Sequence, residues 1–201
     1  AFEEPEAREL PLLAAFSLAR MSVAYAIALV FAIVYGYYAA FSKWKKALLA
    51  ILDVLQSIPI LGFFPAVIFI LINSFNGSPL GLEIAAVLLI FTSMAWNMTF
   101  GVYDSIKSIP SELIETNASF AVTGYLRLKR LVLPALVPKL VYNSMVSWTN
   151  GWYFLIASEI ISFSGQTFQL RGLGSFLANT ITQGRLDLNL LALVFLVLIV
   201  T

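Results

Sequence analysis

Long apolar stretches, separated by short polar turns, run through nearly the whole chain and restrict the folds that it can adopt. Hydrophobic residues make up 60% of the sequence and charged residues only 11%, whereas about 25% of the residues of a soluble domain are charged. The mean hydropathy is +0.90. Backbone groups inside a bilayer must be hydrogen-bonded within the protein, which favours helices. The sequence therefore predicts an all-α polytopic membrane protein with one transmembrane domain, residues 1–201.

The chain contains neither histidine nor cysteine, and its formal net charge is +1. These absences exclude disulfides, thiol or imidazole catalysis, and zinc sites built on those side chains. No paired catalytic acids stand out, and the weak net charge gives no reason to expect a nucleic-acid partner. The sequence also lacks a Gly-rich phosphate-binding loop with its Lys-Ser/Thr. We expect a chain that is not an enzyme and holds no metal ion or cofactor of its own.

Hydropathy predicts five membrane-spanning segments. They cover about residues 21–41, 47–73, 84–102 and 136–161, and the last begins near Leu188 after a loop of residues 162–187. The final apolar run, residues 188–201, is shorter than the ~20 residues that a spanning helix needs. We therefore expect the sequence to be a fragment.

Positive charges predict the orientation of these segments. Eight basic residues fall on one side of the membrane: Lys43, Lys45, Lys46, Lys107, Arg127, Lys129, Arg130 and Lys139. The other side has an acidic start, with Glu3, Glu4, Glu6 and Glu9, and the basic residues Arg8, Arg20, Arg171 and Arg185. We expect Arg20 at the membrane interface, with the stretch before it along the membrane surface. Because basic loops face the cytoplasm, we expect an external N-terminus and a cytoplasmic loop at residues 106–134, in the inner membrane of a prokaryote.

The predicted second span contains two prolines, Pro59 and Pro65. Proline removes a backbone donor and frees a carbonyl one turn earlier. A free carbonyl in lipid must be satisfied by a neighbouring helix or a water-lined cavity. Two interpretations remain open: a kinked helix that packs within the bundle, or a broken helix beside a translocation pathway.

The predicted fourth span is the most polar one. Four of its residues recur at helical spacing and form one stripe: Asn143, Ser147, Asn150 and Ser158. A polar stripe of this kind faces another helix, a partner subunit or water rather than lipid. It therefore lines a substrate pathway or forms hydrogen bonds between subunits. Glu159 lies about 160° from the stripe at 100° per residue.

Residues 108–134 form the longest polar interruption of the chain. Pro110 suits a helix start, and one apolar face follows at helical spacing, made of Ile109, Leu113, Ile114, Ala118 and Ala121. A second helical stretch, residues 125–132, is basic. From periodicity alone, the two helices either rest on lipid headgroups or bind a cytoplasmic protein.

This loop resembles the cytoplasmic EAA loop of permease subunits from ATP-binding-cassette (ABC) importers. That pattern reads Glu-Ala-Ala, three residues, Gly, nine residues, then Ile-x-Leu-Pro. Glu115 takes the glutamate place, Leu131 the isoleucine place, and Leu133-Pro134 the Leu-Pro, without a gap.

The loop is nevertheless a divergent version of the pattern. Thr116 and Asn117 replace the two alanines, and Ala121 replaces the glycine, while Gly124 follows three residues later. Glycine at that place permits a positive-φ turn that alanine resists. We expect Gly124 to supply a turn and the docking to be altered, as in one half of an asymmetric permease pair.

Other segments are similar to the nitrate/sulfonate/taurine type of these permeases. Ser17-Leu-Ala-Arg20 resembles the Ser-Leu-x-Arg before their first span, and residues 55–65, with prolines six apart, resemble their second-span motif. Glu159 matches an acidic residue near the end of their fourth span, and Gly172-Leu-Gly174 matches the Gly-Leu-Gly that follows.

The resemblance implies a type I ABC importer permease fold and a subunit that does not itself catalyse a reaction. Its expected partners are a second permease half (identical, different or fused), two cytoplasmic ATPase subunits that bind the ATP, an extracytoplasmic substrate-binding protein and the lipid bilayer. The loop would couple to the ATPase through Leu113, Ile114, Glu115, Ala118, Ala121, Gly124, Leu131, Leu133 and Pro134. The pathway candidates are Pro59, Pro65, Asn143, Ser147, Asn150, Ser158 and Glu159.

The substrate is a small anion by resemblance only, because no residue of the chain specifies it. The rival hypothesis is an ATP-independent channel or secondary transporter, with the polar loop lying on the membrane surface.

Overall fold

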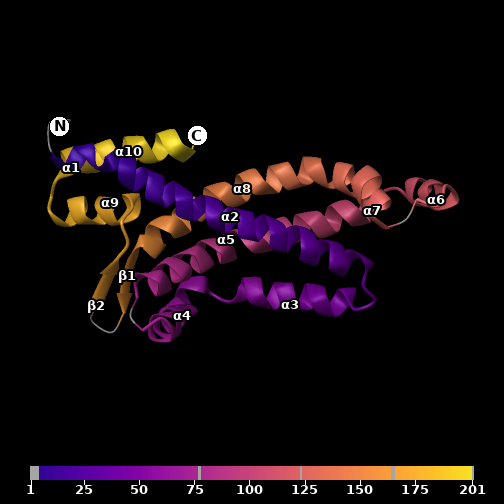
Figure 1. Ribbon diagram of the computed structural model, residues 1–201, viewed down its shortest axis with the longest axis horizontal. Coiled ribbons are helices and arrows are strands. Elements are labelled where there is room, and N and C mark those ends of the chain that lie inside the picture. The colour runs from indigo at the N-terminus through magenta and orange to yellow at the C-terminus, as the bar shows by residue number, and fades with distance from the viewer. Residues whose placement is uncertain (1–4, 77, 123, 164–165, 201) are drawn as a thin grey trace. The chain divides into compact units, whose positions relative to one another are not determined.

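A computed structural model describes residues 5–76, 78–122, 124–163 and 166–200, and helices make up most of this part of the chain (Figure 1). The long helices are α2 (Leu10–Phe41), α5 (Pro79–Lys107) and α8 (Leu133–Glu159). The shorter elements are α1 (Pro5–Arg8), α3 (Lys45–Ser57), α4 (Ile60–Ser74), α6 (Ser111–Ser119), α7 (Gly124–Arg127), the π-helical turn η1 (Leu128–Val132), α9 (Leu173–Thr182) and α10 (Leu186–Val200). Glu3 and Glu4 of the acidic start lie outside the described residues. The prediction of a mostly helical membrane protein is confirmed.

Two helices of the described part are long and apolar enough to cross a membrane, residues Glu6–Phe41 and Pro79–Lys107. The pair α3 and α4 makes a third crossing if it forms one broken span. α8 has 27 residues, and its polar stripe lowers its hydropathy. α10 has 15 residues. The count of five spans therefore stays a prediction.

The first span differs from the prediction at its start. α2 is one continuous helix of 32 residues that begins at Leu10, so the stretch before Arg20 is part of that helix and not a separate surface segment. Apolar residues continue upstream of Arg20, and the buried Leu10, Leu13 and Ala14 pack against α9 and α10.

The chain forms two compact units, each built from separate stretches of sequence. Unit 1 comprises Ala1–Ala26, Pro59–Ser93 and Thr149–Thr201, and unit 2 comprises Ile27–Ile58 and Met94–Trp148. Because α2, α5 and α8 each continue from one unit into the other, no simple cut in the sequence separates them.

The predicted second span is divided into two helices, α3 and α4, while the pathway beside it stays a prediction. Ile58, after the last residue of α3, has φ −73° and ψ 124°, and Pro59, before the first residue of α4, has φ −61° and ψ 107°. Both residues are therefore extended, and the helix cannot pass through them. Pro65 lies inside α4 without ending it. The break therefore lies at Ile58 and Pro59 and not at Pro65.

The predicted loop of residues 162–187 is wrong in its secondary structure. α8 ends at Glu159 instead of Ile161, and β1 (Ile160–Phe163) pairs antiparallel with β2 (Gln166–Gln169), with Ile160 opposite Gln169. The amide of Leu170 donates to the carbonyl of Glu159 at 3.0 Å, which continues this pairing. α9 (Leu173–Thr182) also lies within the predicted loop. Strands of four residues are too short to show a clear period of two.

Among the described residues of unit 1, two apolar clusters join its helices. In the first, Leu10 and Leu13 of α2 pack with Leu173 and Leu177 of α9 and with Ala192 of α10. The second joins α4 to α5 and contains four buried residues: Phe64, Ile68, Ala85 and Leu89.

In unit 2, neighbouring helices approach one another closely at glycine residues. A Cβ added to Gly36 of α2 would lie 2.7 Å from Val102 Cγ1 of α5. One added to Gly101 of α5 would lie 1.7 Å from Asn143 Nδ2 of α8. Small residues let membrane helices come close enough for dispersion and polar contacts to hold them. The two glycines therefore let α2 and α8 each approach α5 closely within this unit.

Candidate functional site

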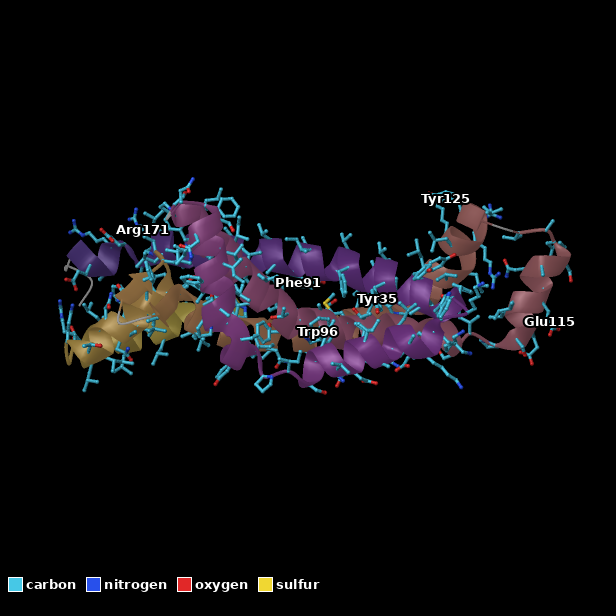
Figure 2. All side chains as sticks on the ribbon, turned by 90° about the horizontal axis from the view of Figure 1, so that it is seen from below. Tyr35, Phe91, Trp96, Glu115, Tyr125 and Arg171 are labelled. Atoms are coloured by element: carbon cyan, nitrogen blue, oxygen red, sulfur yellow. The ribbon has the colours of Figure 1, made fainter. Side chains whose placement is uncertain are left out.

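α6 forms the tip of the predicted cytoplasmic loop and buries none of its residues. It lies beyond α7 at one end of unit 2 (Figure 1), and Glu115 and Tyr125 mark the same end in Figure 2. Leu113 is 49% exposed and Glu115 is exposed. Because no residue of α6 is buried in the described part of the chain, its apolar side chains are accessible to another surface.

The predicted apolar face of this helix is partly wrong. Ile109 is buried and precedes the first residue of α6, whereas Ala121 follows its last residue. Only Leu113, Ile114 and Ala118 of the predicted face lie on α6 itself. Pro110 takes the N-cap position with φ −57° and ψ 140° and provides no side-chain cap. Fixed proline geometry, rather than a hydrogen-bonding cap, therefore starts the helix.

α6 ends in a left-handed turn made by an alanine. Ala121 has φ 53°, the Val122 amide donates to the Asn117 carbonyl at 2.9 Å, and the Ala121 amide donates to the Ala118 carbonyl at 3.0 Å. This pair of bonds defines the Schellman cap, in which glycine usually takes the left-handed position. Ala121 thus adopts the positive-φ turn that alanine was expected to resist. Gly124 also has a positive φ, 56°, so it adds a second turn.

From Gly124 onward the chain is helical without interruption through α7, η1 and α8. The amide of Leu133 donates to the carbonyl of Leu128, which is the wider π spacing. Pro134, which has no amide hydrogen, follows this π turn. A π turn before a proline lets the helix continue despite the missing donor. The end of the loop is therefore part of the same helix as the fourth span.

Several predicted loop residues line one hollow of about 320 Å³ in unit 2, among them Leu113, Leu131 and Pro134. Leu131 is buried, whereas Leu133 and Pro134 are exposed. The structure thus brings the start of α6 close to the start of α8.

A second feature, in unit 1, is a buried cluster of charged groups. Arg20 donates from Nη1 to Glu159 Oε1 at 2.8 Å, and from Nε and Nη2 to Glu83 at 2.6 Å and 2.8 Å. The Ser17 hydroxyl donates to Glu159 Oε1 at 2.6 Å. The Arg20 and Glu159 side chains are 6% and 0% exposed, whereas that of Glu83 is 40% exposed. Arg20 is therefore a buried, ion-paired residue within unit 1, and its position at the membrane interface stays a prediction.

Glu159 also holds the N-terminus of α9. The amide of Gly174 donates to Glu159 Oε2 at 2.6 Å, and the amide of Leu173 donates to Ser17 Oγ at 2.9 Å. The first amides of a helix have no partner within it and favour negative charge. Because the N-cap residue is Gly172, which has no side chain, Ser17 and Glu159 provide the cap from α2 and α8.

At Gly172 and Gly174, beside this cap, there is no room for a larger side chain. A Cβ on Gly172 would lie 2.1 Å from Glu159 Oε1, and one on Gly174 would lie 2.8 Å from Ile156 Cα. Gly172 has φ 178°, a backbone conformation open to any residue. The cluster thus joins three segments that resemble permease motifs: Ser17 to Arg20, Glu159, and Gly172 to Gly174.

Residues 16–201 match a protein family described as the binding-protein-dependent transport system inner membrane component. The chain belongs to this family. No curated protein matches the chain. Family membership makes it a multi-pass inner-membrane component of an ABC transport system and places it among permease subunits, which are not enzymes.

In this family member, the predicted polar stripe divides into two parts. In unit 2, the Asn97 amide donates to the Asn143 carbonyl at 3.3 Å and to Ser147 Oγ at 3.1 Å, and Ser147 donates to the Met94 carbonyl at 3.3 Å. Asn143 and Ser147 therefore bind α5 of the same chain. In unit 1, Ser158 is buried and donates to the Leu155 carbonyl at 2.8 Å, while Asn150 is exposed.

Sequence reasoning missed two residues of these sites, Glu83 and Asn97. Glu83 is the partner of Arg20, and Asn97 is the partner of Asn143 and Ser147. Ionisable residues within membrane segments seek partners or water. That rule singles out Glu83, because it is the only acidic residue between Pro79 and Phe100.

Proposed function

We propose that this chain is the permease subunit of an ATP-driven importer, and that a cytoplasmic ATPase subunit docks on α6. The observation that carries the proposal is α6 itself, which keeps an amphipathic sequence but buries none of its residues. Family membership supports the proposal, since an ABC transport system contains an ATPase. The residues proposed to take part are those that match the EAA pattern, namely Glu115, Leu131 and Leu133-Pro134.

The helix geometry suggests how movement leaves the docking site. α7, η1 and α8 form an unbroken helical path, and Leu131 and Val132 are buried within unit 2. Movement of α7 therefore reaches α8 through hydrogen-bonded helical backbone rather than through a flexible linker. α8 carries Asn150, which is exposed and is the most accessible of the polar pathway candidates.

The complete transporter in this proposal contains a second permease half, two ATPase subunits that bind ATP, and an extracytoplasmic binding protein. The substrate is a small anion, a proposal that rests only on the resemblance to nitrate, sulfonate and taurine permeases. The pathway lies along Asn150 and the broken segment at Pro59. Asn143, Ser147 and Glu159 then support the pathway through hydrogen bonds to neighbouring elements, and Ser158 through a hydrogen bond within α8.

The test is charge reversal on α6. In Glu115→Lys we expect the ATPase to be lost when the permease is purified from membranes, because the basic side chain repels the group that pairs with Glu115. Glu112→Lys is the matched control, since Glu112 is exposed on the same helix and undergoes the same change of charge. It should retain the ATPase.

Unchanged co-purification in Glu115→Lys would refute the role of that residue. Equal loss in both variants would mean that the general charge of α6, and not the EAA position, governs docking. Uptake by the reconstituted permease that needs neither ATP nor an ATPase would contradict the proposed function and support a channel or secondary transporter.

A further inference from the structure

Two basic residues, one on each side of α6, meet at the last turn of α2. Lys107, the last residue of α5, donates from Nζ to the carbonyl of Ala40. Arg127, the last residue of α7, places its guanidinium carbon 5.3 Å from the centre of the Phe41 ring. All four residues belong to unit 2. The loop is thus in contact with α2 from both of its ends.

Both contacts are of a kind that holds a helix end. The last carbonyls of a helix have no partner within it and attract cations. The ammonium group of Lys107 binds one such carbonyl at the end of α2. A guanidinium over an aromatic ring is attracted by the negative face of the ring. Arg127 Nε is buried and has no hydrogen-bond partner within the described residues. The Phe41 ring therefore provides the contact that holds this buried edge of Arg127.

The last turns of α2 are themselves fixed within unit 2. The Tyr35 hydroxyl donates to the Leu48 carbonyl of α3 at 2.9 Å, and Gly36 lies against Val102 of α5. The Phe41 ring also packs on Tyr37, with ring centres 4.9 Å apart. A displacement of Phe41 is therefore passed to the body of α2 rather than absorbed by a loose helix end.

From these contacts we infer that Arg127 and Phe41 form a second transmission route, which carries movement of the coupling loop into α2 independently of the route through Pro134 into α8. Arg127 and Phe41 act as positioning residues in this route, because they link two helices and touch no substrate. The inference rests on the proposed function, since movement of the loop requires a docked ATPase. Lys107 holds the last turn of α2 against the end of α5, where the loop begins.

The chain has no cysteine, so single reporter cysteines can be introduced without further changes. We would place one on α2 as Tyr38→Cys and one on α8 as Tyr142→Cys, at side chains that are 59% and 66% exposed. Each receives a spin label in the complete permease–ATPase complex, and label mobility is recorded before and after addition of MgATP. Without other changes, both reporters should respond to MgATP.

Introducing Arg127→Gln or Phe41→Leu should reduce the α2 response at least threefold and leave the α8 response within about 20% of its original size. Arg127→Lys, which keeps the cation, should restore most of the α2 response. Lys129→Gln is the charge-matched control, because Lys129 is exposed one residue beyond the start of η1, and it should leave both responses unchanged. Combining Arg127→Gln with Phe41→Leu should be no worse than either change alone, as expected for two groups that act through one contact.

A full α2 response in Arg127→Gln or Phe41→Leu would overturn the inference. Loss of both responses together with the ATPase would also overturn it, because Arg127 would then belong to the docking surface. If neither reporter responds in the unaltered complex although the ATPase remains bound, ATP does not drive this chain and the proposed function fails with the inference. Contacts between residues do not by themselves prove that movement passes between them. A variant that weakens the α2 response and keeps the α8 response would provide that proof.

Discussion

Glu159 satisfies both of its carboxylate oxygens with donors from different parts of the chain. Oε1 accepts from Ser17 and Arg20, and Oε2 accepts from the Gly174 amide. Removing one partner from a buried ion pair commonly costs about 3–5 kcal/mol, because the remaining charge is left without compensation. Arg20 divides its donors between two carboxylates, so it neutralises Glu159 and holds Glu83 at the same time. The cluster therefore acts as a brace for α2, α5, α8 and α9 within unit 1.

Because the cluster is tightly packed, adding one methyl group at Gly172 should destabilise the protein. In Gly172→Ala the new Cβ would lie 2.1 Å from Glu159 Oε1, so the carboxylate or the helix must move. We expect the free energy of unfolding to fall by about 1–3 kcal/mol, the usual cost of overpacking. Thermal unfolding in detergent measures the change.

Gly62→Ala is the matched control for this substitution. A Cβ at position 62 would meet only Pro59 Cβ, at 3.8 Å, and alanine favours a helix over glycine by about 1 kcal/mol. Gly62→Ala should therefore be neutral or stabilising. If Gly172→Ala unfolds at the same temperature as the unaltered protein, Glu159 is not held in the geometry described.

At the scale of elements, three helices end in the same type of left-handed turn with three different residues. Gly184 follows α9 with φ 70°, Asn76 follows α4 with φ 51°, and Ala121 follows α6 with φ 53°. Glycine adopts this region freely and asparagine tolerates it, whereas alanine resists it because of its Cβ. α6 therefore ends in the least favourable of the three caps, at the element that the proposed function assigns to docking.

Ala121→Gly should relieve this cost and stabilise the end of α6 by about 0.5–1 kcal/mol. The measurement is hydrogen exchange of the α6 amides, which should slow in the variant. Gly184→Ala is the reciprocal change in the same kind of cap, and the α9 amides should exchange faster. Faster exchange of α6 in Ala121→Gly would show that the alanine is not strained.

At the scale of the whole molecule, the two units show different kinds of internal contact. Unit 1 contains the charged brace and the two clusters of large apolar side chains. Unit 2 contains glycine contacts, the hydrogen bonds of Asn97, and the projecting α6. The basic residues that predict the cytoplasmic side all belong to unit 2. We therefore expect the loop of unit 2 to face the cytoplasm and the α9–α10 turn of unit 1 to face the exterior.

Single cysteines test this orientation directly, because the chain has none of its own. Ser119→Cys and Gln183→Cys both occupy exposed positions. In intact cells a membrane-impermeant maleimide should label only Gln183→Cys, and in inverted vesicles only Ser119→Cys. The reverse pattern would contradict the topology predicted from the positive charges.

The sequence by itself determined the class of protein and the kind of element, because both depend on local properties. Apolar stretches predicted membrane helices, the two prolines predicted a kink or a break in the second span, and the polar segment with Glu115 predicted a short amphipathic helix. Hydropathy, helical periodicity and the missing amide of proline act over a few residues, so they can be read without knowing the fold.

Only the tertiary structure decided which residues meet. Ser17 and Glu159 are 142 positions apart in the sequence, and no local pattern links them or reveals that Glu83 completes the set. Arg20 was expected at the membrane interface because a lone cation in an apolar helix normally seeks the membrane surface, and only the fold shows that two carboxylates from distant segments pair with it. Ala121 likewise adopts a turn that its own preference opposes, because the hydrogen bonds of the Schellman cap outweigh the cost at one residue.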